Sequence, residues 1–502
     1  MGKGIRKGFF TYLLIFIGII IAAAAVCAVI MIFSPGTQIL GLSYYNYNEI
    51  RYILEADSFA TSESETSSER ITVNNELKMI DIDHFVVNTD GMNVEFVKKS
   101  SDWSGVEKAL NVQLNLNLRG FIKGNENALN ISSKYFEDTK TLELNIKSPT
   151  TFINLGNWSN ILIELPSNLN SNKTFEVNTT GGSVNLGGNG TSLNRPQVLT
   201  AAQINITTEG GSVETSDYFN LSGVAYNSSV KTKTGALKFS RPIVCNSFSF
   251  ETESGNATFS NDIFNISEDF NLKANMSFVE INKITATNLN LVNTNGKIYA
   301  GNITGNVIFS EDSANCDIQV KNITGSVLIG EKNKENISQT TSVKISECLN
   351  GEANIFTKGN IFINKIEGTT NIKAEGNTVE IVEINAPLNI THKNSKITLG
   401  KLADDQNNLL GCEIVEKINV IGSNSIINLY FENVADDSKV KNTNGTVFVK
   451  LTNPAKAVIT AKSVKVNGEA AELIDGTLEH VYSDGTNVIT IVNTNGKVEI
   501  EE

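Results

Sequence analysis

The sequence predicts an all-β protein with one N-terminal transmembrane helix, and three observations predict it. Residues 9–33 form an uncharged apolar run. Residues 78–175 alternate apolar and polar side chains with the period of two that is typical of strands. In residues 176–502 a turn containing threonine and glycine, followed by an alternating strand, recurs about every twenty residues, which is typical of a β-solenoid.

The composition excludes two classes of protein. The 502 residues include 41 Lys plus Arg and 54 Asp plus Glu, so the formal net charge is −13. A basic nucleic-acid binder is therefore excluded. With 5 Cys in the whole chain, a disulfide-dense secreted module is excluded as well. Apolar residues make up 40% and charged residues 19%, so the chain can bury a core while neutral polar groups cover its surface.

The N-terminal segment of the chain predicts a membrane anchor. As a helix, residues 9–33 span a bilayer core of about 30 Å. Lys3, Arg6 and Lys7 precede this segment, so we expect residues 1–8 in the cytoplasm and the C-terminal part outside the cell membrane. A cleavable signal peptide is the alternative, because residues 22–25 supply small side chains near a plausible cleavage site.

Two details favour an uncleaved single-pass anchor. The apolar run continues to Phe33, well beyond the short apolar core of a signal peptide. Cys27 follows the bulky Val26, which is unlike a lipidation site, so Cys27 is interpreted as a membrane-helix residue.

Residues 34–77 are interpreted as a juxtamembrane segment and a stalk. Tyrosines within residues 35–54 are predicted at the lipid headgroup boundary. Residues 55–69 are rich in Ser, Thr and Glu and cannot bury enough apolar surface to offset their chain entropy. A flexible stalk is the expected result.

Residues 78–175 are predicted to form a β region with its own core, to which Trp103 and Trp158 are assigned. Its strands alternate apolar and polar residues, and a turn is expected at Asp90–Gly91. The predicted strands are 79–82, 85–89, 112–118, 142–146 and 161–165.

Residues 176–502 contain the repeats. The glycines of the first copies are Gly182, Gly211, Gly235 and Gly255, and the spacing between them narrows along the chain to about twenty. The longer step from Gly255 to Gly296 equals two units with a degenerate turn near residue 275. The copies are 177–184, 206–213, 230–237, 250–257, 292–298, 440–447 and 492–498. A unit of this length fits one coil of a β-solenoid, so we expect about sixteen coils.

The chemistry of the repeat gives three further expectations. The turn glycines are expected to supply a positive φ, which a flanking Asn also tolerates. Asn, Thr and Ser are expected to stack on like residues of neighbouring coils, although an AT-rich genome would also raise the Asn content. The last coil, 492–502, is expected to have an exposed edge, at which Glu499, Glu501 and Glu502 would discourage pairing; whether charge alone caps this edge stays open.

One segment resembles a known family. Ile161–Pro166 followed by Phe175–Leu186 is similar to the strand, Leu-Pro and Thr-x-x-Gly-x-Val-x-Leu signature of the bacterial putative-adhesin family, whose function is uncharacterised. The resemblance covers roughly residues 78–502 and implies a β-stranded, extracytoplasmic, membrane-anchored protein of the cell envelope. It implies no catalytic or ligand residues. Two stretches, 187–202 and 331–349, depart from the repeat.

No catalytic, cofactor or metal residue is predicted. His84, His392 and His480 have no metal-ligand or triad spacing. The Cys245, Cys316 and Cys412 side chains share the inward parity of their apolar neighbours, while Cys348 lies near a predicted turn; their disulfide state stays open.

Some enzymes with a β-solenoid fold act on polysaccharides, which makes this class an alternative. Such chemistry needs paired carboxylates, or a carboxylate with Arg or Lys, on adjacent coils. Arg is absent after Arg241, and the pairs 311–312, 404–405 and 436–437 are sequence neighbours that point apart in a strand or lie in a solvated turn. No calcium-binding repeat is present. The prediction is a protein that is not an enzyme.

The function expected from the sequence is surface adhesion or contact with the cell wall or a glycan. The alternative is an envelope-stress sensor that acts through a membrane partner, and a less favoured one is a polysaccharide-active enzyme. The expected partners are the membrane, through one helix, and a surface glycan or another envelope protein, with no nucleic acid and no cofactor. The ligand and the oligomeric state are not predicted.

Overall fold

The protein is described from a computed structural model in full atomic detail. The described residues are 3–34, 37–55, 82–98, 111–123, 129–136, 138–148, 151–165, 169, 172–188, 197–262, 264–310, 314–330, 337, 340–403, 408–409, 416–451, 455–482 and 486–501. The stalk predicted at 55–69 lies outside these residues except for Glu55, and Trp103 and Cys412 lie outside them as well.

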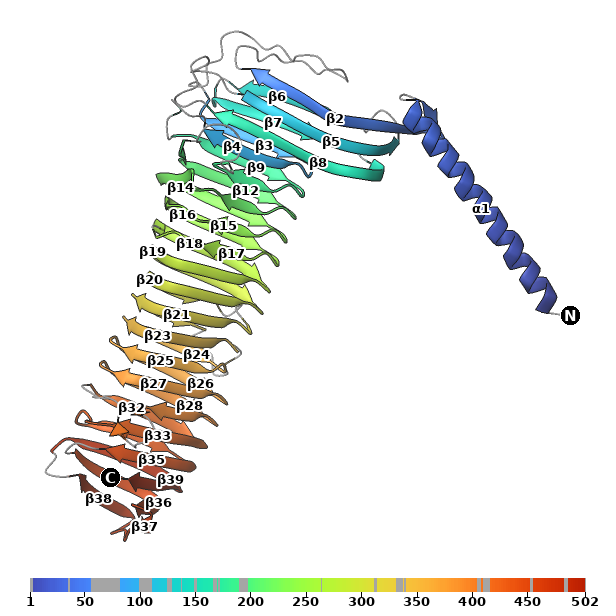
Figure 1. Ribbon diagram of the computed structural model, residues 1–502. Helices are drawn as coiled ribbons and strands as arrows, with labels where there is room; N and C mark the ends of the chain where they lie inside the picture. Colours follow the sequence, from blue (N-terminus) through green and yellow to red (C-terminus); the bar gives the residue numbers. More distant parts are fainter. Residues whose placement is uncertain are drawn as a thin grey trace. The chain divides into compact units, whose positions relative to one another are not determined.

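One helix and a large β structure make up the described chain (Figure 1). Helix α1 (Lys3–Phe33) contains a 24-residue segment, Phe10–Phe33, that is long and apolar enough to cross a membrane. A signal sequence near an N-terminus has the same property. Cys27 lies in this helix, as predicted.

The chain divides into two compact units, residues 1–201 with 205–219, and residues 202–204 with 220–502. The first strands are β1 (Gln38–Ile39), β2 (Leu42–Glu55), β3 (His84–Thr89), β4 (Asn93–Lys98), β5 (Asn111–Lys123), β6 (Asn130–Phe136), β7 (Thr141–Lys147), β8 (Thr151–Leu165), β9 (Thr174–Thr179), β10 (Val184–Leu186), β11 (Leu199–Ala201), β12 (Gln203–Thr208) and β13 (Val213–Thr215). The predicted strands at 85–89, 112–118, 142–146 and 161–165 are confirmed within β3, β5, β7 and β8.

The remaining strands lie in the second unit, apart from the first residue of β14. They are β14 (Phe219–Thr232), β15 (Leu237–Phe239), β16 (Ile243–Thr252), β17 (Ala257–Phe259), β18 (Phe264–Asn275), β19 (Phe278–Thr294), β20 (Lys297–Phe309), β21 (Asp317–Thr324), β22 (Val327–Ile329), β23 (Ser342–Asn350), β24 (Ala353–Thr357), β25 (Ile361–Ile366), β26 (Thr370–Glu375), β27 (Thr378–Ile384), β28 (Leu388–Lys393), β29 (Lys396–Leu399), β30 (Leu402–Ala403), β31 (Asn408–Leu409), β32 (Ile418–Ser423), β33 (Ser425–Phe431), β34 (Ser438–Asn442), β35 (Gly445–Leu451), β36 (Ala455–Val466), β37 (Glu469–Ala470), β38 (Thr477–Tyr482) and β39 (Val488–Glu501).

The first unit contains parallel and antiparallel pairs. β3 lies between β7 and β9, parallel to both, and its Phe85 stacks on Phe175 with ring centroids 5.3 Å apart. On the opposite wall, β4 pairs in parallel with β8 and β10, and Phe96 meets Phe175 edge-on at 4.9 Å. Alternate residues of these strands are buried, so the rings fill the space between the two walls.

β2 was not predicted. It pairs antiparallel with β5 along residues 42–55, and β5 pairs antiparallel with β8. Residues 35–54 were expected to form a low-order juxtamembrane segment because their tyrosines suit a headgroup boundary. In the sequence, Tyr45 and Tyr47 alternate with Asn46 and Asn48, and aromatic residues are equally favoured in strands when a partner strand is present.

The second unit is built from parallel strands in register. Leu237 pairs with Ala257, Ala257 with Val279 and Val279 with Ile298, so each layer follows the previous one after about twenty positions of the chain. The long interval between Gly255 and Gly296 does contain two layers, since β18 ends at Asn275 opposite Thr294 of β19. Figure 1 shows these strands layered in sequence order from β14 to β35.

The expected positive φ at the early turn glycines is wrong. Gly182, Gly211 and Gly255 do not adopt a positive φ. A Cβ at Gly211 would lie 1.8 Å from the Gly182 carbonyl oxygen, and one at Gly255 would lie 1.9 Å from that of Gly235. These turns therefore need glycine because adjacent layers approach too closely for a side chain. In later copies the expectation is confirmed: Asn295, which flanks Gly296, has a φ of 55°, and Gly445 has a φ of 109°.

The predicted stacking of amides between layers is confirmed. Asn290 Nδ2 donates to Asn271 Oδ1 at 2.8 Å. Asn371 Nδ2 donates to Asn354 Oδ1 at 3.1 Å, and Asn371 Oδ1 accepts from Asn389 Nδ2 at 3.0 Å. Each side-chain amide thus forms a hydrogen bond with an amide of the next layer. Part of the high asparagine content therefore lies in outward-facing rows along the layers.

The last strand of the chain is not the edge of the sheet, contrary to expectation. β39 pairs in parallel with β34 and β35 on one side and with β36 on the other. The chain therefore passes outward to β36, turns through β37 and β38, which pair antiparallel with β36, and returns to fill the inner position. Strand pairing, rather than the charge of Glu499 and Glu501, covers both edges of β39.

Candidate functional site

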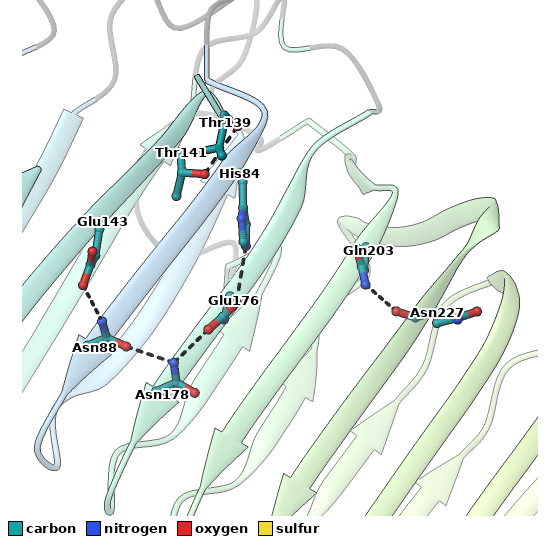
Figure 2. Close-up of polar contacts among 9 residues, drawn as sticks. All are labelled: His84, Asn88, Thr139, Thr141, Glu143, Glu176, Asn178, Gln203 and Asn227. Carbon is teal, nitrogen blue, oxygen red and sulfur yellow. Dashed lines mark hydrogen bonds and ion pairs between the residues drawn. The ribbon is translucent and has the colours of Figure 1, made fainter. Parts of the chain in front are cut away.

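The outward face of β7, β3 and β9 holds a continuous polar network (Figure 2). Asn178 Nδ2 donates to Asn88 Oδ1 at 2.9 Å and to Glu176 Oε1 at 3.1 Å. Asn88 Nδ2 donates to Glu143 Oε1 at 3.2 Å, and His84 Nε2 lies 3.4 Å from Glu176 Oε2. Register creates this network, because residues 88 and 178 are direct partners on parallel strands.

The two carboxylates of this network, those of Glu143 and Glu176, have their positions fixed by hydrogen bonds. Both carboxylates already accept hydrogen bonds from amides, and the network contains no serine or cysteine nucleophile. Across the described ranges, no group of three or more His, Cys, Asp and Glu residues is arranged to hold a metal ion. The arrangement presents fixed donors and acceptors at one strand spacing, about 4.8 Å.

A second feature is a bulge in β14. Gly223 pairs with Cys245 and Asn227 with Ser247, so three residues of β14 face one residue of β16. The extra residues push Val224 and Tyr226 outward, where 65% and 41% of their surfaces are exposed. Bulges of this kind re-aim side chains and are common beside functional sites.

Both ends of this bulge are fixed. A Cβ on Gly223 would lie 1.8 Å from the carbonyl oxygen of Ala202, so the backbone closes tightly there. At the other end, Gln203 Nε2 donates to the Asn227 carbonyl oxygen at 2.6 Å (Figure 2). The side chain of Asn246 donates to Asn227 Oδ1 at 3.0 Å.

The next layers continue the feature with polar side chains. Asn246 Nδ2 also donates to Glu268 Oε2 at 3.0 Å, and Asn288 Nδ2 donates to Asp269 Oδ1 at 2.9 Å. We call residues 224–227 together with Asn246 and Glu268 the bulged corner. It combines an exposed aromatic ring, two amides and a carboxylate within three neighbouring layers.

The bulged corner was not predicted from the sequence. The signal was present, because Gly223-Val-Ala-Tyr226 interrupts the apolar and polar alternation of the surrounding strand. Without the register of β14 against β16, this interruption cannot be distinguished from an ordinary turn.

The histidines occupy three different strands. His84 is in β3, His480 is in β38, and His392 is buried in β28. His392 Nδ1 lies 2.8 Å from Ser425 Oγ, whose hydroxyl is placed to donate to the Ser423 carbonyl oxygen. Burial lowers the pKa of His392 to about 4, so this imidazole is neutral at pH 7.

The cysteines of the described chain are free thiols. Cys245 and Cys316 are buried, as predicted, and burial raises the pKa of each to about 12. Such thiols are poor nucleophiles because little thiolate forms. Cys348 lies near the end of β23, three residues before the bend at Gly351, and beside an irregularity in strand register.

Of the three carboxylate pairs singled out in the sequence, 436–437 lies within the described residues, in a turn. Asp437 pairs with Lys417, whose hydrogen bond lowers the Asp437 pKa, and Asp436 Oδ1 accepts from the Val488 N–H at 3.0 Å. These contacts hold the turn at residues 436–437 in place. The pairs 311–312 and 404–405 lie outside the described residues.

A buried lysine supports the first unit. Lys173 is 1% exposed, and its Nζ donates to Asp83 Oδ1 at 2.8 Å. This hydrogen bond is the main cause that lowers the pKa of Asp83, and it outweighs the opposing effect of burial. A buried ammonium needs such a partner, so the role of the pair is structural.

Comparison with known proteins identifies no family. No protein-family model and no curated protein matches the chain. A crystal structure described as a putative cell adhesion protein from Clostridium sporogenes aligns over 84% of this chain and 93% of its own, with 9% identity and a TM-score of 0.13. A TM-score this low does not define a common fold.

Proposed function

We propose that this chain is a membrane-anchored, extracytoplasmic β-solenoid protein that makes non-catalytic contact with a cell-wall or surface glycan and thereby acts in adhesion. The observation that carries the proposal is the in-register stacking of outward amides in the parallel layers, as at Asn354, Asn371 and Asn389. A repeating surface of this kind suits a repeating polymer, because neutral amides both donate to and accept from hydroxyl groups.

The apolar helix supports the cellular location. α1 is long enough to span a bilayer, and Lys3, Arg6 and Lys7 precede its apolar segment. Positive residues favour the cytoplasmic side, so the N-terminus is inside and the β units are outside. The resemblance of residues 161–186 to the putative-adhesin signature agrees with an envelope protein.

Three local environments support a non-catalytic role. The His392 imidazole is buried and neutral, the Cys245 and Cys316 thiols are buried and protonated, and the Glu143 and Glu176 carboxylates are held by amides. A general acid or base must instead reach a substrate with a pKa near the working pH.

Two measurements on the full chain test the proposal. Protease added to intact cells is expected to cut between α1 and the β units and to release a β-rich fragment. Full-length protein in lipid nanodiscs is expected to sediment with purified cell-wall polysaccharide, whereas empty nanodiscs stay in solution. Protection from protease contradicts the topology, and the absence of binding to any wall or surface glycan contradicts the function.

A further inference from the structure

At the bulged corner, exposed apolar side chains directly precede Asn227, which is hydrogen-bonded to Asn246 in the next layer. Tyr226 and Val224 are exposed by 41% and 65%, although their neighbours along β14 alternate normally into the core. Leaving apolar surface in water is unfavourable, so a ligand that covered these two side chains would gain free energy by burying them. The corner is also well defined, because Gly223, Gln203 and Asn246 fix its backbone.

We propose that the bulged corner is a saccharide-binding site, in which the Tyr226 ring stacks on the apolar face of a sugar ring and the side chains of Asn246 and Glu268 bind its hydroxyl groups. This inference rests on the proposed function and assigns its contact to particular residues. An aromatic ring offers a flat apolar surface with a polar tip, and such residues dominate the energetics of contact sites.

The polar partners have suitable chemistry. Asn246 Nδ2 is shared between Asn227 Oδ1 and Glu268 Oε2, both at 3.0 Å, so the three groups are held in a row. An amide carbonyl has two lone pairs and a carboxylate has about four acceptor positions, so the row keeps acceptors for hydroxyl donors. Adjacent hydroxyls of a sugar present such donors side by side.

The site is expected to bind a neutral saccharide. Glu268 in the corner and its sequence neighbour Asp269 carry two negative charges, and both carboxylates accept hydrogen bonds from amides. An acidic glycan would be repelled by these carboxylates unless a cation bridged them.

The test uses full-length protein in nanodiscs and three probes, namely an N-acetylglucosamine tetramer, a glucose tetramer and purified peptidoglycan. At least one probe is expected to bind wild-type protein, and Tyr226→Ala is expected to weaken that binding about tenfold or more. Tyr226→Phe keeps the ring and is expected to retain most of the affinity. Tyr299→Ala, on β20 outside the corner, is the matched control and is expected to bind like wild type.

The outcomes separate this inference from the proposed function. If a probe binds and Tyr226→Ala and Asn246→Ala bind it equally well, glycan contact stands and the corner is not the site. If a chelator such as EDTA abolishes binding, a bridging cation carries the contact and the direct-stacking proposal is wrong. If neither these probes nor a wider panel of wall glycans binds wild type, the proposed function fails together with this inference.

Discussion

Two kinds of turn in the second unit use different side chains to form hydrogen bonds with backbone groups. In the threonine turns, Thr232 and Thr252 accept a hydrogen bond from the N–H of the glycine three residues later, at 2.8 Å in both cases. In the asparagine turns, Asn377 Nδ2 donates to the carbonyl oxygens of Thr357 and Gly359, which belong to the preceding layer.

The difference lies in what each side chain connects. A threonine hydroxyl caps its own turn, as is usual for Ser and Thr, and it also donates to the preceding layer. Thr252 Oγ1 donates to the Lys233 carbonyl oxygen at 3.4 Å, and Thr357 Oγ1 donates to that of Thr341 at 2.6 Å.

The longer amide of Asn377 reaches across the layers, and its Oδ1 accepts from Ser395 Oγ at 3.1 Å in the following layer. Asn442 and Asn493 likewise bond to an earlier layer, because their side chains donate to the carbonyl oxygens of Ser425 and Gly445. Threonine turns thus combine a cap of their own turn with one bond to the preceding layer, whereas Asn377 bonds to both the preceding and the following layer.

The largest expected effect comes from the turn glycines. Gly255→Ala is expected to cost about 4 kcal/mol, since its Cβ would meet the Gly235 carbonyl oxygen at 1.9 Å and backbone must shift. Gly376→Ala, in an asparagine turn with open space and a φ of 71°, is expected to cost about 1 to 2 kcal/mol. Urea unfolding of the full chain, followed by circular dichroism, measures both. Equal costs would contradict the claim that close approach of the layers requires glycine at Gly255.

The second effect is a pH dependence of the free energy of unfolding, and it comes from His392 in the region of the asparagine turns. Burial lowers the pKa of His392 from 6.5 to about 4, so between these values the unfolded chain binds the proton that the folded chain excludes. Stability from this group is complete above pH 6.5 and is lost as the pH falls towards 4, by about 3 kcal/mol in total. Urea midpoints at pH 7, 5.5 and 4.5 measure the loss.

Replacement at this position supplies the control. His392→Leu is expected to flatten the pH profile, while His480→Gln on the outer strand β38 is expected to leave it unchanged. A profile that stays steep in His392→Leu would assign the acid sensitivity to other groups.

The third effect compares the turn side chains directly. Asn377→Ala removes two buried hydrogen bonds to backbone carbonyls and is expected to cost about 2 kcal/mol. Thr252→Val leaves one N–H without its cap and is expected to cost about 1 kcal/mol. Hydrogen exchange should become faster in the layers on both sides of Asn377, whereas for Thr252 it should become faster only in its own turn and in the preceding layer at Lys233. Effects of equal spatial extent would contradict the distinction between the turns.

The smallest effect is expected on the outward rows. Asn371→Ala breaks the hydrogen bonds to Asn354 and Asn389, yet water can replace them, so the cost is expected to be about 0.5 kcal/mol. Thermal unfolding against the Asn377→Ala variant gives the comparison. A loss as large as that of Asn377→Ala would mean that outward amides hold the layers together as strongly as buried ones.

The sequence predicted local structure well where a single strand and its turn decide the outcome. Alternation located β3, β5, β7 and β8, and the spacing of the glycines located the layers, including the degenerate turn at Asn275. The outward asparagines could be assigned to stacked rows because parallel layers repeat their side chains in register. The bulged corner was missed, since a bulge is defined by the partner strand.

The remaining errors have the same origin. Gly211 and Gly255 were correctly recognised as essential, but the reason is the approach of a neighbouring backbone, and a sequence does not show distances between layers. β39 was expected at the edge because chain order was assumed to equal spatial order, whereas β36 occupies the outer position.

The sequence by itself determined an apolar N-terminal helix, a β protein and a repeat of about twenty residues, because helix and strand periodicity are properties of one segment. Only the tertiary structure decided which strands are neighbours, why particular turns require glycine, and where Tyr226 emerges from the surface. These features depend on contacts between residues about twenty or more positions apart, and the free energy of such contacts is set when the layers pack.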